Sequence, residues 1–123
     1  MSGNKSFSIS NRIKSFGFAI EGIITFFKTQ HNAWIHAFAT VIVVVVGFVL
    51  KVNNAEWCLL ATAIAMVFIS EMLNTAIEFL TDIVSPGYNI QAKKVKDVAA
   101  GAVLISAIAA VVIGVIIFLP KLW

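Results

Sequence analysis

Three acidic residues and two polar neighbours share one face of a predicted helix, inside a strongly apolar part of the sequence. Glu71, Asn74, Thr75, Glu78 and Asp82 follow one another at spacings of one to four residues, which aligns them along one side of a helix. A charge at membrane depth costs about 2.5–3.5 kcal/mol or more. These acids are therefore expected to serve a function, and they need cations, protons or a metal nearby.

The chemistry that such groups suit is phosphoryl transfer, which depends on positioning and charge neutralisation. Carboxylates hold Mg²⁺, a lysine contacts the phosphates, and a base takes the proton of the attacking hydroxyl. Glu71 is predicted to lie deepest in the lipid, where a poorly solvated carboxylate suits proton abstraction, so it is the candidate base. Glu78 is the candidate magnesium ligand, and Asn74 could hold Glu71 or a substrate hydroxyl. Lys96 and Asp97 would meet the phosphates and the nucleotide.

The overall composition is that of an integral membrane protein. Of the 123 residues, 60% are hydrophobic and only 12% are charged, whereas about 25% of residues are charged in a soluble domain. Three apolar segments, residues 29–50, 56–84 and 93–119, are long enough to cross a bilayer as helices. We therefore predict an all-α fold, with three transmembrane helices in a single membrane domain spanning residues 1–123.

The segment 1–28 carries apolar side chains on one helical face and most of its charges elsewhere. Ser8 or Ser10 could cap the start of a helix here. Because the sequence offers no soluble domain for this helix to pack against, we expect it to lie on the inner surface of the membrane. Its apolar face consists of Phe16, Ile20, Ile23, Ile24 and Phe27.

The distribution of cations predicts the orientation. Seven of the nine lysines and arginines lie on one side of a three-span topology. The positive-inside rule makes this side the cytoplasm, so the N-terminus and the loop after the second span are predicted to be cytoplasmic. The net charge therefore reports topology and does not indicate nucleic acid. In the loop after the second span, Pro86 and Gly87 suit the middle positions of a type II turn. The seven cations are Lys5, Arg12, Lys14, Lys28, Lys93, Lys94 and Lys96, and Trp34, Trp57 and Trp123 lie near predicted span ends.

Two linked motifs resemble a known family. The run Glu71-Met-Leu-Asn-Thr-Ala-Ile-Glu78 with Asp82, followed by Lys93-x-x-Lys96-Asp97-Val-Ala-Ala-Gly-Ala102, is similar to the signature of the small prokaryotic diacylglycerol kinases, a family that includes undecaprenol kinases. The resemblance covers nearly the whole chain. It implies a multi-pass lipid kinase of the bacterial inner membrane that uses ATP and Mg²⁺. It also implies a homotrimeric helical bundle whose active sites are shared between neighbouring protomers.

The resemblance also implies roles for individual residues. Glu71 would be the catalytic base in contact with the lipid substrate, with Asn74 beside it. Glu78 would bind both magnesium and ATP. Gln30 aligns with a position where similar members carry a glutamate that is a second metal ligand near ATP, and an amide offers an oxygen but no charge. The remaining implied ATP contacts are Phe18, Tyr88, Lys96 and Asp97.

The identity of the lipid is a finer prediction. The run of residues 74–78, the Asn-x-x-Ile-His run of residues 32–36 and the Phe-Leu-Pro-Lys ending at 118–121 look more like the undecaprenol branch than the diacylglycerol branch. Two other functions compete with a kinase: a small proton-coupled transporter and a catalytically inactive membrane oligomer. Glu71 could likewise be half of a structural ion pair, and His36 is interpreted as a hydrogen-bonded packing residue.

Overall fold

In the computed structural model, residues 8–122 are described, and all of their regular elements are helical. The helices are α1 (Ile9–Thr29), α2 (His31–Val49), α3 (Asn54–Val84) and α4 (Ile90–Phe118), followed by a short 3₁₀ helix, η1 (Leu119–Leu122). Three stretches are long and apolar enough to cross a membrane, namely α2, α3 and α4 with η1. The all-α fold and the three predicted membrane helices are thus confirmed. Lys5 and Trp123 lie outside the described residues.

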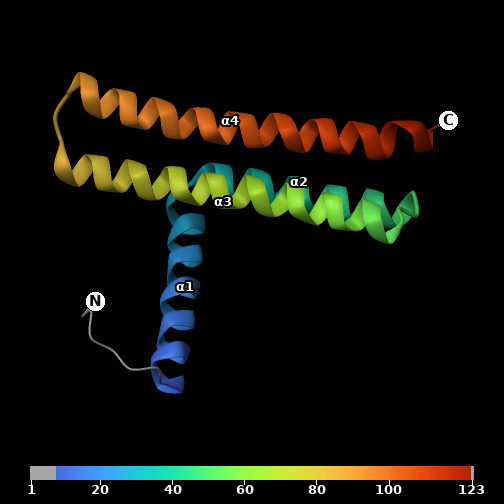
Figure 1. Cartoon of the computed structure of the whole chain (residues 1–123), viewed down its shortest axis with the longest axis horizontal. Helices are drawn as coiled ribbons and strands as arrows, with labels where there is room; N and C mark the ends of the chain where they lie inside the picture. The colour runs from blue at the N-terminus through green and yellow to red at the C-terminus, as the bar shows by residue number, and fades with distance from the viewer. Residues whose placement is uncertain (1–7, 123) are drawn as a thin grey trace.

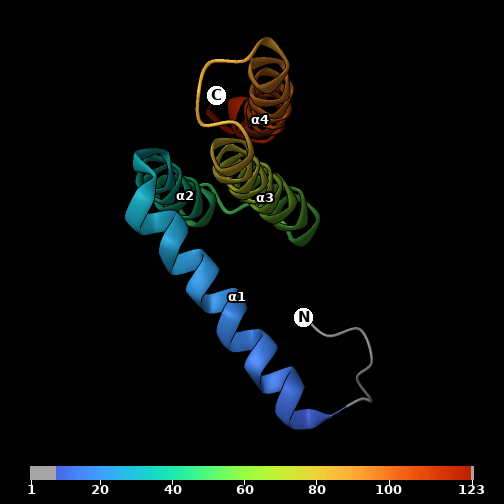
Figure 2. The same cartoon turned by 90° about the vertical axis from the view of Figure 1, so that its left-hand side faces the viewer.

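The three membrane helices run side by side, with α3 between α2 and α4 (Figures 1 and 2). The most extensive packing is between α3 and α4. The helix α1 leaves this bundle at a steep angle from the start of α2. This arrangement suits a helix on a membrane surface next to three that cross the membrane.

Both ends of α1 are fixed by hydrogen bonds, and a single residue, Gln30, makes the corner between α1 and α2. At the start of α1, Ser8, one of the two serines expected to cap this helix, accepts a hydrogen bond from the backbone N–H of Asn11 at 3.4 Å. At the other end, Gln30 takes an extended conformation, and its N–H donates to Phe26 O at 3.0 Å. Trp34 Nε1 donates to Phe27 O at 2.9 Å across the corner. The corner therefore fixes where α1 leaves the bundle.

Hydrogen bonds fix the turn between α2 and α3 at the end of α2 and at the start of α3. Lys51 adopts a left-handed conformation with φ 57°, and Val52 N–H donates to Gly47 O at 3.1 Å, as in a Schellman motif. Asn53 and Glu56 then form a capping box at the start of α3. At the same end of the bundle, Lys121 Nζ of η1 lies 3.0 Å from Glu56 Oε2. These contacts tie three helix ends together.

The connection between α3 and α4 differs from the prediction. Within the described residues no glycine has a positive φ, so Gly87 does not form the predicted type II turn, which requires one. The prediction was wrong because residues 85–89 give the chain enough length to cross between the two helices without a tight turn. Asn89 ends the connection and caps α4, accepting from Gln91 N–H at 2.8 Å and Ala92 N–H at 3.3 Å.

Gly47 is a position where a small change should have a large structural cost. A Cβ added there would lie 2.5 Å from the Trp57 ring, and that ring already packs on Phe48 with centroids 4.9 Å apart. We expect Gly47→Ala to lower the free energy of unfolding by about 1–3 kcal/mol. Thermal unfolding in detergent would measure this effect. The control is Gly22→Ala in α1, where a Cβ meets nothing within 4 Å, and an equal melting temperature for both variants would contradict the expectation.

Candidate active site

The most buried acid of the polar face is paired with a residue from α2. Glu71 is 6% exposed, and its Oε1 lies 2.9 Å from His36 Nε2. This contact joins the middle of α3 to the second turn of α2. A buried carboxylate needs such a partner because an unpaired charge in an apolar environment is very costly.

Aromatic rings hold this part of α2 against α3. The His36 ring meets Phe68 edge-on, with centroids 6.2 Å apart. Phe68 in turn lies 6.3 Å from Phe27 at the end of α1, and Phe27 packs on Trp34 at 5.1 Å. Each of these separations is within the range of a favourable aromatic contact. The corner between α1 and α2 and the Glu71 partner are thus held by one cluster.

One turn further along α3, an amide is bonded to the second glutamate. Asn74 Nδ2 donates to Glu78 Oε1 at 3.0 Å. Asn74 does not hold Glu71, and its own Oδ1 is buried without a hydrogen-bond partner. The Thr75 hydroxyl donates to the backbone carbonyl of Glu71 at 2.9 Å. The Asn74 amide and the Glu78 carboxylate therefore lie next to each other, and Asn74 Oδ1 is left as an acceptor for a ligand.

The end of α3 meets the start of α4 through charged side chains. Lys96 Nζ lies 2.7 Å from Asp82 Oδ1, and the charge of Glu78 also acts on Lys96. Lys93 pairs with Asp97 at 2.7 Å within α4. These pairs are largely exposed, so each contributes little to stability. They are available to exchange partners with an anionic ligand.

Three of the predicted site residues make no hydrogen bond to this polar face within the described residues. Phe18 is 69% exposed on α1, and Tyr88 is 85% exposed in the connection before α4. Gln30 sits at the corner, where its Nε2 donates to Thr29 Oγ1 at 3.2 Å. Within the described residues, none of the three has a hydrogen bond to the acids of α3. Among the predicted site residues, the side-chain contacts between helices are therefore those of α3 and α4.

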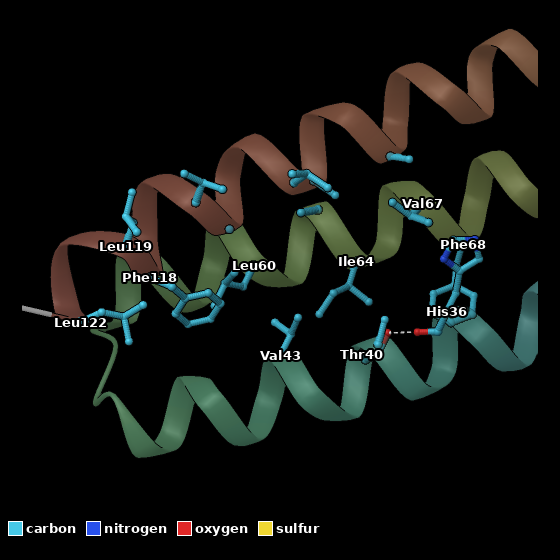
Figure 3. A pocket seen from close by; sticks show the side chains of 17 residues that line it. His36, Thr40, Val43, Leu60, Ile64, Val67, Phe68, Phe118, Leu119 and Leu122 are labelled. Atoms are coloured by element: carbon cyan, nitrogen blue, oxygen red, sulfur yellow. Dashed lines mark hydrogen bonds between the residues drawn. The ribbon is translucent and has the colours of Figure 1, made fainter.

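An apolar groove leads to the Glu71 partner. Figure 3 shows this groove, about 530 Å³ in volume, between α2, α3 and α4, with His36 at one end and η1 at the other. Thr40 is its second polar residue, and the Thr40 hydroxyl donates to the His36 backbone carbonyl at 2.7 Å. The groove therefore suits a hydrocarbon chain whose polar end lies near His36. Its apolar lining includes Val43, Leu60, Ile64, Val67, Phe118 and Leu122.

The donor atoms near Glu78 fit magnesium, which the resemblance implies. Mg²⁺ is usually held by one or two carboxylates together with substrate phosphates and water. Glu78 supplies a carboxylate, and the unpartnered Asn74 Oδ1 supplies a second hard oxygen. The described residues contain no group of three or more His, Cys, Asp or Glu side chains that could hold a metal. The residues thus suit a metal that binds together with phosphates.

Two parts of the site were not identified from the sequence. His36 is hydrogen-bonded and packs on Phe68, as predicted, but the sequence did not identify Glu71 as its partner. Asp82 was left without a role, and the structure pairs it with Lys96. The 14-residue separation of Lys96 and Asp82 crosses the connection, so helix periodicity could not reveal that contact.

Known proteins provide an independent comparison. The model of the prokaryotic diacylglycerol kinase family matches residues 17–118. Undecaprenol kinase of Bacillus subtilis (strain 168) is 40% identical over 109 residues, covering 89% of each chain. Diacylglycerol kinase of Synechocystis is 42% identical over 113 residues, covering 91% of this chain and 65% of that relative. Diacylglycerol kinase of Escherichia coli (strain K12) is 28% identical over 109 residues, again 89% of each chain. The chain belongs to the prokaryotic diacylglycerol kinase family and is a membrane-embedded, ATP-dependent lipid kinase.

Proposed function

We propose that this protein transfers the γ-phosphate of ATP to the hydroxyl of undecaprenol, with Glu71 as the general base. The observation that carries the proposal is the position of Glu71. It is buried in an apolar helix, and its partner His36 lines the end of an apolar groove. A lipid whose chain lies in the groove would present its hydroxyl beside this carboxylate.

In the proposed reaction, Glu71 takes the proton of the lipid hydroxyl. The oxygen then forms a bond to the γ-phosphorus, the bond between that phosphorus and the β–γ bridging oxygen breaks, and ADP leaves with the electron pair. Glu78, with Gln30 as the expected second ligand, would hold Mg²⁺, which supplies charge neutralisation on the phosphates. Lys96 and Asp97 bind the nucleotide end. Phe18 and Tyr88 are proposed ATP contacts.

The preference for undecaprenol is supported by the groove and by the relatives. The groove runs as one path from His36 to η1, which suits a single long chain better than two acyl chains. Where the match covers 89% of both chains, identity is 40% to the undecaprenol kinase of Bacillus subtilis and 28% to the diacylglycerol kinase of Escherichia coli. The Synechocystis diacylglycerol kinase is 42% identical, over 65% of that protein. The phosphorylated product of this reaction is undecaprenyl phosphate.

The proposal includes an assembly and an orientation. Phe18 and Tyr88 are strongly exposed in one protomer, and a homotrimer in which neighbours complete each site, as the family resemblance implies, would give them partners. Lys93, Lys94 and Lys96 lie in the first turns of α4, where Lys96 pairs with Asp82 near the end of α3. We place this end at the cytoplasmic face of the bacterial inner membrane, where ATP is available.

The test is ATP-dependent phosphorylation in detergent micelles, with undecaprenol and diacylglycerol offered together and magnesium varied. We expect undecaprenol to receive most of the label, with label dependent on magnesium. Preferential labelling of diacylglycerol would reverse the choice of lipid and retain the mechanism. No labelling of either lipid at any magnesium concentration would contradict the proposal.

A further inference from the structure

We infer that His36 is a positioning residue for Glu71: its imidazole holds one carboxylate oxygen and leaves the other for the lipid hydroxyl. The inference rests on the proposed function, in which Glu71 is the base. His36 Nε2 and Glu71 Oε1 are 2.9 Å apart, with side chains 24% and 7% exposed. The contact is thus nearly closed to water on the Glu71 side.

The other polar side chains near Glu71 are already engaged elsewhere. The Asn74 amide donates to Glu78 at 3.0 Å, and the Thr75 hydroxyl donates to the backbone carbonyl of Glu71 at 2.9 Å. The Ser70 hydroxyl donates to the backbone carbonyl of Val67 at 3.0 Å. Among these neighbours, none reaches the Glu71 carboxylate. His36 is therefore the side chain of the described residues that sets its orientation.

The position of the imidazole is itself constrained. Phe68 meets the ring edge-on at 6.2 Å, and the interplanar angle is 69°. Apart from His36, the residues that line the groove carry no titratable group, and those from α4 and η1 are apolar. A hydrogen bond in such surroundings is stronger than in water. Phe68, which also lines the groove, and the apolar surroundings of the ring therefore favour the rotamer that points Nε2 at Glu71.

This geometry has a consequence for the reaction. With Nε2–H donating to Oε1, the carboxylate cannot rotate freely, and Oε2 is left to accept the hydroxyl proton. After the transfer, the proton resides on Oε2 and the bond from His36 to Oε1 persists. His36 thus acts through Glu71 and not on the substrate, and its loss should reduce the rate of the chemical step more than it reduces ATP binding.

The experiment compares two substitutions of His36 in the full-length protein. His36→Leu removes the donor and keeps an apolar side chain of similar bulk, whereas His36→Gln restores a donor at about the same reach. We expect His36→Leu to lower kcat for undecaprenol by about 10- to 100-fold, with the KM for ATP changed less than about 3-fold. His36→Gln should recover most of the loss. The matched control is His31→Leu, at an exposed position of the same helix, which should keep the wild-type kcat.

The outcomes separate this inference from the proposed function. A kcat for His36→Leu within about 3-fold of wild type, alongside an inactive Glu71→Gln, would overturn the positioning role and leave the base intact. An active Glu71→Gln would instead overturn the proposed function. Equal losses in His36→Leu and His36→Gln, together with a lowered melting temperature in both, would show a structural role and also overturn the inference. In a Glu71→Asp background, where the carboxylate is withdrawn from His36, we expect His36→Leu to cause no further loss.

Discussion

Replacing Glu71 by glutamine is expected to abolish lipid phosphorylation while leaving the protein folded. The substitution removes the ability to take a proton but keeps the shape of the side chain. General-base catalysis contributes about 100- to 10,000-fold, so kcat should fall by that factor. The hydrogen bond to His36 can be retained by the amide, because an imidazole both donates and accepts. Radiolabel transfer from ATP to undecaprenol in micelles would measure the loss.

The competing explanation is that Glu71 only joins two helices. In that case Glu71→Gln would keep its turnover or would lose activity together with its folded state, as seen by size-exclusion chromatography and thermal unfolding. A useful contrast is Glu56→Gln on the same helix. Glu56 contacts Lys121 and the Asn53 backbone, so its replacement should lower the melting temperature while kcat stays near that of wild type.

Replacing Glu78 by glutamine is the second change for which we expect a large effect. An uncharged amide is a much weaker magnesium ligand than a carboxylate, and it cannot offset the charge of the metal. We expect kcat/KM for MgATP to fall by about 100-fold or more, within the range seen when ligands or their supports are lost. Raising the magnesium concentration should recover part of the activity. A magnesium titration of ATP turnover measures both effects.

Two further variants make the result specific to metal binding. Asp82→Asn removes the partner of Lys96 from an exposed pair, and it should change kcat/KM by less than about 10-fold without changing the magnesium requirement. Gln30→Glu adds a carboxylate at the corner between α1 and α2, and it should lower the magnesium concentration needed for half-maximal activity. An unchanged magnesium titration in Glu78→Gln would show that Glu78 does not hold the metal.

The sequence predicted those parts of the fold that depend on local patterns. Long apolar segments and the helical spacing of Glu71, Asn74 and Glu78 are properties of single helices, so the three membrane helices and the shared face were visible without a structure. The capping box of Asn53 and Glu56 was equally local, an Asn-x-x-Glu pattern, and it places the start of α3 at Asn54.

The remaining features depend on how separate helices meet. Which residue of α2 faces Glu71 is set by the packing of Phe27, Trp34 and Phe68, and no spacing within α2 encodes it. The conformation of the Pro86–Gly87 connection follows from the distance between two helix ends rather than from its dipeptide. The roles of Gln30, Phe18 and Tyr88 come from the family resemblance alone, since no spacing within one chain predicts which residues contact a nucleotide.

The contact between Glu56 and Lys121 joins the start of α3 to nearly the last residue of the chain. Because a protein is made from its N-terminus, Glu56 is synthesised long before Lys121 exists. In a nascent chain with two spans inserted, this carboxylate has its capping role but lacks its cation. The ion pair at 3.0 Å closes only after α4 has crossed and η1 has formed. The turn between α2 and α3 therefore has all of its contacts only in a fully inserted chain, and a chain shortened by three residues would lack this ion pair.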